Sequence, residues 1–125
     1  MKKVSKILIL FLAFSLVVGC GVKQVVLTPE QETDRLYFEQ KNQHNHALKF
    51  FTESLTKYNV WCGSPGYEDV CAVVDPYWKT TNTALDTWGE VIEKREPLAG
   101  SQEAYRNALK RLKTEMLMKI PDFDW

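Results

Sequence analysis

The chain has 125 residues, of which 45% are hydrophobic and 26% charged, an ordinary globular composition. Its formal net charge is +0 at pH 7, but all 16 acidic residues follow the first 19 positions, which carry three lysines and no acid. The body of the chain is therefore mildly acidic, which argues against nucleic acid as a partner because phosphate binding needs a basic face. Roughly a hundred residues suffice for one hydrophobic core and not for two.

The first 19 residues have the pattern of an export signal. Lys2, Lys3 and Lys6 precede an apolar run over 7–18 that only Ser15 interrupts. As a helix this run would rise roughly 18 Å, well short of the ~30 Å hydrocarbon core of a bilayer. The pattern therefore favours a cleaved signal peptide over a transmembrane anchor.

The apolar run ends in a Val-Val-Gly-Cys sequence at 17–20, which resembles the lipobox of bacterial lipoproteins. The resemblance implies cleavage before Cys20, lipidation of its thiol, and a membrane spacer over 20–27. Acyl chains contribute about 0.8 kcal/mol per buried CH₂, so two or three hold a small domain durably at a bilayer. Gly21 stands where Asp would retain an enteric lipoprotein in the inner membrane, so in a diderm host we expect the inner leaflet of the outer membrane, facing the periplasm. The alternative is an ordinary signal peptide with a coincidental cysteine.

Residues 28–120 are predicted to form one all-α domain, a small bundle of three to four helices in antiparallel hairpins. A first helix start is indicated by the capping-box pair of Thr28 and Gln31, with Pro29 between them. Its inward face recurs every seven residues, at Tyr37, His44, Phe51 and Tyr58. We expect an interruption at 42–43 and a non-helical stretch over 59–67, which is rich in turn formers.

Further helix boundaries are predicted from proline, glycine and serine. Asp75-Pro76 has the pattern of a second helix start, and 70–74 is the one segment that allows a short extended piece. Residues 96–100 break that helix, Ser101 is expected to cap the next, and Pro121 ends it. The predicted inward faces are Trp78, Thr81, Leu85, Trp88 and Ile92, and then Tyr105, Ala108, Leu109, Leu112 and Met116.

The segment 38–55 resembles one tetratricopeptide repeat. The match places Phe38 in a first helix, a turn at 42–44, and Ala47 and Phe51 in a second helix. A fainter match begins at Trp88-Gly89 and continues to Ala108, 54 residues further on rather than the usual 34. The resemblance implies paired helices that meet at small residues, and two plain helical hairpins would give nearly the same structure.

Cys62 and Cys71 enclose eight residues that contain two glycines and a proline. In an oxidising compartment such a pair forms a disulfide, which we expect here. Metal binding would need further Cys or His ligands, and a redox pair usually has Cys-x-x-Cys spacing. The histidines, His44 and His46, point about 200° apart on a helix and do not form a metal-binding pair. We therefore predict no metal site and no cofactor.

Four tryptophans are many for so small a domain. Trp78 and Trp88 have core spacing, whereas Trp61 flanks the cysteine loop and Trp125 ends an acidic–aromatic tail at 121–125. Two alternatives stand for this tail. It folds back to plug the core, or it is a docking peptide in which Phe123 and Trp125, with Trp61, bind a partner through exposed aromatic rings.

The last helix carries five basic residues: Arg106, Lys110, Arg111, Lys113 and Lys119. They form either a solvated face or a surface that lies against anionic headgroups.

No serine, histidine and acid stand in a recognisable catalytic arrangement, so we expect no enzyme. The expected function is a non-enzymatic protein-interaction or structural module, anchored by acyl chains on Cys20 and facing another envelope protein. Exclusion lipoproteins of phages and plasmids are one compatible class. The alternatives are a glycan- or peptidoglycan-binding module with exposed tryptophan faces and, third, a small hydrolase.

Overall fold

The computed structural model describes residues 27–125, and the predicted signal peptide, Cys20 and most of the spacer lie outside this range. The described residues contain three helices and no strand: α2 (Pro29–Cys62), α3 (Glu68–Glu93) and α4 (Ser101–Lys119). The prediction of a small all-α bundle is therefore confirmed.

The chain divides into two compact units, Met1–Leu36 and Tyr37–Trp125. In the described part of the first unit, the capping box at the start of α2 is present. The Gln31 amide donates to Thr28 Oγ1 at 3.2 Å, and the Thr28 amide donates to Gln31 Oε1 at 3.0 Å. Arg35 pairs with Glu32 one turn later, and this hydrogen bond lowers the pKa of the Glu32 carboxyl. The predicted start of the first helix is thus confirmed in detail.

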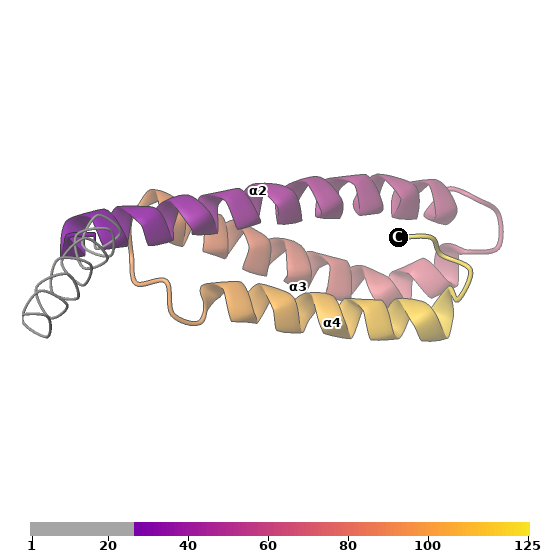
Figure 1. Cartoon of the computed structure of the whole chain (residues 1–125). Helices are drawn as coiled ribbons and strands as arrows, with labels where there is room; N and C mark the ends of the chain where they lie inside the picture. The colour runs from indigo at the N-terminus through magenta and orange to yellow at the C-terminus, as the bar shows by residue number, and fades with distance from the viewer. Residues whose placement is uncertain (1–26) are drawn as a thin grey trace, which may run out of the picture. The chain divides into compact units, whose positions relative to one another are not determined.

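The second unit is a bundle in which α2 from Tyr37 onward lies beside α3 and α4 (Figure 1). Residues 63–67 join α2 to α3, and residues 94–100 join α3 to α4. α3 and α4 pack against each other as an antiparallel hairpin. The second connection turns at Arg95 (φ 52°) and Gly100 (φ 90°), both left-handed. The Tyr37 hydroxyl donates to the Glu96 carbonyl and so joins this connection to α2.

The core of the second unit follows the predicted periodicity. All five predicted inward residues of α3 are buried: Trp78, Thr81, Leu85, Trp88 and Ile92. In α4, Tyr105, Leu112 and Met116 are buried as expected. Phe51 and Tyr58 are buried on α2, whereas His44 and Tyr37 lie at the core edge. Ala108 and Leu109, also predicted to face inward on α4, are half-buried, so the prediction is confirmed in full for α3 and in part for α2 and α4.

The helix boundaries differ from prediction at several places. α2 continues through 42–43 and ends at Cys62, and α3 begins at Glu68, so that Pro76 and the segment 70–74 lie inside the helix. Pro76 removes one intrahelical hydrogen bond, but burial of Cys71 and Val74 offsets this loss. At α4 the N-cap is Gly100 rather than Ser101, whose hydroxyl instead donates to the Leu98 carbonyl at 3.3 Å.

The continuous α2 also bears on the repeat resemblance. The residues matched to its turn, 42–44, are helical, so 38–55 contains no helical hairpin. Tertiary contacts hold this stretch in helix: Gln43 accepts a hydrogen bond from Gln102, and His44 bonds to the Leu85 carbonyl. The hairpins of this bundle are instead formed by whole helices.

Candidate functional site

Cys62 and Cys71 form a disulfide, with their Cα atoms 5.9 Å apart. It joins the last residue of α2 to the first turn of α3, so the structural role expected for this pair is confirmed. Beside it, the half-buried Trp61 ring meets the Tyr67 ring edge-on at a centroid distance of 5.1 Å. Trp61 therefore packs over the cysteine loop and does not project as a free anchor.

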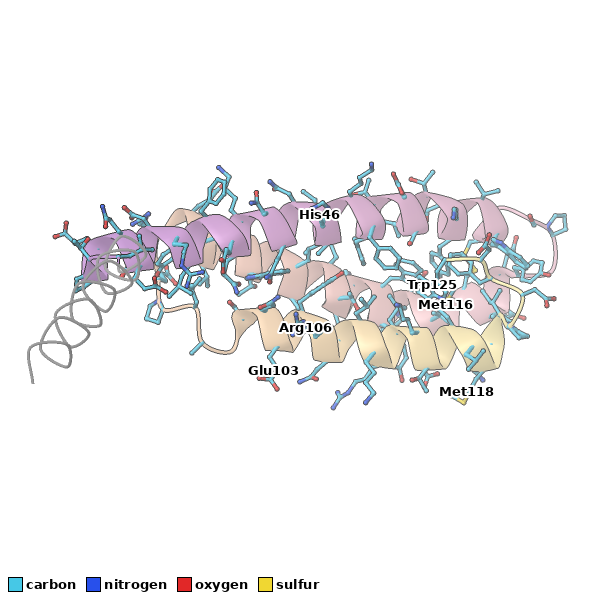
Figure 2. All side chains as sticks on the ribbon, in the orientation of Figure 1. His46, Glu103, Arg106, Met116, Met118 and Trp125 are labelled. Carbon is cyan, nitrogen blue, oxygen red and sulfur yellow. A yellow bond between two sulfur atoms is a disulfide. The ribbon has the colours of Figure 1, made fainter. Side chains whose placement is uncertain are left out.

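The tail over 121–125 folds back onto the bundle. Trp125 stacks on Trp78 at 5.5 Å and lies near Phe50 at 6.1 Å, while Phe123 is 7% exposed. Lys113 places its ammonium over the Phe50 and Trp125 rings. Figure 2 shows Trp125 directed between the helices. The tail therefore folds back onto the core, which is the first of the two alternatives. Because Phe123 is buried, it is not one of the exposed residues that could bind a partner.

Trp61 and Trp125, the two tryptophans that a glycan-binding site would need exposed, both pack against other aromatic rings. Trp78 itself is buried, and its indole N–H has no hydrogen-bond partner within residues 27–125. The tail therefore covers an aromatic cluster of Phe50, Phe51, Tyr58 and Trp78.

A chain of glutamine contacts, which the sequence analysis did not anticipate, joins the three helices. The Trp88 indole donates to Gln40 at 2.8 Å, the Gln40 amide donates to Gln102 at 3.0 Å, and Gln102 donates to Gln43 at 2.6 Å. Glutamines on an amphipathic helix are ordinarily read as solvated, so the sequence carries no clear signal for this network. It fixes the register of α2 against its neighbours.

His44 belongs to the same region, and its ring nitrogen Nε2 lies 2.9 Å from the Leu85 carbonyl oxygen. Its ring also meets Trp88 edge-on, at 5.1 Å. His46 is exposed, so the two histidines diverge as expected. Within residues 27–125, no group of three or more His, Cys, Asp or Glu side chains is arranged to hold a metal ion.

Two tyrosines have raised pKa values. Burial, and then hydrogen bonding to Asp75 at 2.6 Å, raise the pKa of Tyr58, whose hydroxyl also contacts the Cys71 carbonyl at 3.1 Å. Burial alone raises the pKa of Tyr105. Both groups remain protonated at neutral pH, where they act as packing and hydrogen-bonding groups.

Charge is segregated between α3 and α4. Within α3, Lys79 is the one basic residue against six acids: Glu68, Asp69, Asp75, Asp86, Glu90 and Glu93. Asp75, Asp86, Glu90 and Glu93 are all exposed and recur at helical spacing on one side of the helix, which we call the acidic stripe. α4 has the reverse balance, with five basic residues and two acids, Glu103 and Glu115.

The outward surface of α4 combines cations with exposed apolar groups. Arg106, Lys110, Lys113 and Leu117 follow one another at spacings of four, three and four, and we call them the outer face of α4. With Leu109 and Thr114 they line a shallow groove of about 420 Å³. Leu117 is 69% exposed and Met118 63% exposed. Met116, the residue before Leu117, is buried instead, because consecutive helical residues point about 100° apart.

A second depression runs between α3 and α4, where hollows of about 590 and 300 Å³ share Tyr77, Asn107 and Arg111. Thr80, Ala104 and Ala108 also line it, and the acids of the acidic stripe do not. The acidic stripe and the outer face of α4 are therefore separate surfaces of the second unit.

Comparison of the chain with family models, with curated proteins and with solved structures returned no significant match. Within residues 27–125, no helix is both long and apolar enough to cross a membrane. The candidate site thus rests on the chain's own surfaces, the acidic stripe of α3 and the outer face of α4.

Proposed function

We propose that this chain is a lipid-tethered envelope protein that acts by binding, not by catalysis, with another envelope protein as its partner. The observation that carries the proposal is the segregation of charge into two exposed surfaces of opposite sign on one disulfide-linked bundle. Charged surfaces of this kind orient an approaching partner and select against partners of the same sign.

The anchor in this proposal comes from the amino-terminal pattern. Three lysines, a short apolar run and the lipobox-like sequence ending in Cys20 support lipidation of that cysteine. The disulfide between Cys62 and Cys71 supports an oxidising compartment such as the periplasm, where such bonds persist. Together these features favour the inner leaflet of the outer membrane in a diderm host.

The protein partner is proposed to meet the acidic stripe. Asp86, Glu90 and Glu93 occupy successive turns near the end of α3, and all three are exposed. Within residues 27–125, only Glu90 of these three has an ion-pair contact, to Lys94 at 3.9 Å. A basic surface on the partner complements this arrangement. The outer face of α4 remains free for a second contact.

Cys20→Ser tests the anchor. We expect the variant to leave the membrane fraction, while the native protein carries an acyl-modified N-terminal cysteine by mass spectrometry. Cys62→Ser with Cys71→Ser is the matched control, since it removes two thiols without touching the anchor. A native protein that retains residues 1–19 and bears no fatty acid would contradict the proposal.

Photocrosslinking in intact cells tests the partner surface. A photoreactive residue at Asp86 is expected to give a discrete adduct, which weakens when Glu90 and Glu93 are changed to lysine. The same residue at Asn45, exposed on α2, is the control position. Equal adducts at both positions would exclude the acidic stripe as the partner surface.

A further inference from the structure

The outer face of α4 has a composition that differs from an ordinary solvated helix surface. Three of its four residues are cationic, and the fourth, Leu117, is 69% exposed. The two acids of α4 are Glu103, one turn before Arg106, and Glu115, which shares a hollow with Lys110.

The cations of this surface are available for a ligand. The side chains of Arg106 and Lys110 make no hydrogen bond or ion pair with other residues in the range 27–125. Lys113 is held over the Phe50 and Trp125 rings, so the folded tail fixes the position of one charge of the face. Leu109 and Leu117 line the same groove as these cations. The surface therefore offers positive charge and apolar contact within about three turns of helix.

We propose that the outer face of α4 binds the anionic phosphate headgroups of the bilayer to which the protein is tethered. This inference rests on the proposed function, since the tether keeps lipid phosphates within reach of the domain. Cations at an anionic membrane surface each contribute favourably, and the exposed Leu117 side chain enters the headgroup boundary.

The opposite charge of α3 strengthens the argument. An anionic membrane repels the acidic stripe and attracts the outer face of α4, so the two act together to orient the domain. With α4 against the lipid, the acidic stripe lies on a different side of the bundle and stays open to a protein partner. One tethered module then has a membrane face and a partner face.

The test uses the purified lipoprotein in vesicles of phosphatidylcholine, with or without phosphatidylglycerol. Lysine acetylation by a water-soluble reagent is measured by mass spectrometry, and the rate at Lys113 is divided by the rate at Lys79, an exposed residue of α3. We expect this ratio to fall about fivefold in the anionic vesicles and to recover at high salt. An equal ratio in both vesicles would overturn the proposal.

A matched pair of variants distinguishes binding through the outer face of α4 from an effect of the overall net charge. Arg106→Glu with Lys110→Glu is expected to abolish the protection of Lys113, whereas Lys49→Glu with Lys57→Glu, the same charge change on α2, leaves it intact. All four positions are exposed, so neither variant disturbs the core. If both variants lose protection equally, overall charge and not this face is responsible, and the proposal fails.

Two further outcomes are distinguished by the same measurements. Protection of Lys113 in cells but in neither vesicle would assign the face to an acidic protein and overturn the lipid assignment. Absence of acyl mass on the N-terminal peptide would instead refute the tether. In that case cosedimentation of the unlipidated protein with the two vesicles, compared between the paired variants, still decides whether the face binds anionic lipid.

Discussion

At the scale of single residues, helical periodicity predicts which side chains lie in the core, but it does not predict their hydrogen-bond partners. Tyr58 sits at a predicted core position, but its hydroxyl joins α2 to Asp75 and to the Cys71 carbonyl. The position of the ring follows from helical spacing, whereas its hydrogen-bond partners depend on how α3 packs.

Because of Tyr58, the free energy of unfolding is expected to depend on pH in the alkaline range. Its pKa is raised in the folded protein, so folding favours the protonated hydroxyl. The stabilisation is complete below the unfolded pKa of about 10 and is lost as pH rises above it. We expect the free energy of unfolding to fall above pH 10 in urea titrations, and Tyr58→Phe to flatten this slope in part, because Tyr105 also has a raised pKa. An unchanged slope in the variant would contradict this account.

Gly89 and His44 are predicted to be coupled. A Cβ on Gly89 would lie 2.8 Å from His44 Cε1 and Nε2, so Gly89→Ala displaces the ring from its bond to the Leu85 carbonyl. We expect Gly89→Ala to destabilise the native chain. After His44→Ala the same change should stabilise by up to about 1 kcal/mol, the helix preference of alanine over glycine. Urea melts of the four proteins measure this reversal of sign, and additive effects would argue against the contact.

At the scale of elements, helix ends were harder to predict than helix faces. Asp75-Pro76 has every local feature of a helix start, yet α3 begins seven residues before Asp75 because Cys71 and Val74 are buried against the rest of the bundle. The disulfide acts in the same direction, since it holds the first turn of α3 against the end of α2. Burial of apolar side chains therefore outweighs the local sequence signal for a helix start.

The tail is predicted to contribute to stability. Deleting residues 123–125 removes the buried Phe123 and uncovers Trp78, and we expect a loss of about 3 kcal/mol in the free energy of unfolding. Asp122→Ala with Asp124→Ala keeps the rings and changes only exposed acids, so it should alter stability by less than about 0.5 kcal/mol. Thermal melts of both variants give the comparison. Similar melting temperatures for the deletion and the native chain would mean that the rings contribute little.

At the scale of the whole molecule, the buried core belongs to one unit. Among residues 27–125, the thirteen buried hydrophobic residues, from Phe51 to Phe123, all fall within Tyr37–Trp125. The described residues before Tyr37 are mainly exposed and satisfy their polar groups locally, through the capping box and the Glu32–Arg35 pair.

A chain that begins at Tyr37 is therefore expected to fold. Its free energy of unfolding should lie within about 1 kcal/mol of that of the chain that begins at Leu27, because none of residues 27–36 is buried. Near-ultraviolet circular dichroism and urea melts of the two chains measure this. A truncated chain without fixed aromatic signals would show that residues 27–36 are needed for the fold.

The sequence by itself determined the all-α class, most of the inward-facing residues of the helices, the capping box at Thr28 and the cysteine pair. Each of these follows from local spacing or from residue chemistry within a few turns. Tertiary structure alone decided that α2 runs unbroken through 42–43, that Pro76 lies inside α3, and that Phe123 and Trp125 cover Trp78. Those outcomes depend on burial between segments far apart in the chain, where the free energy of packing exceeds any local preference.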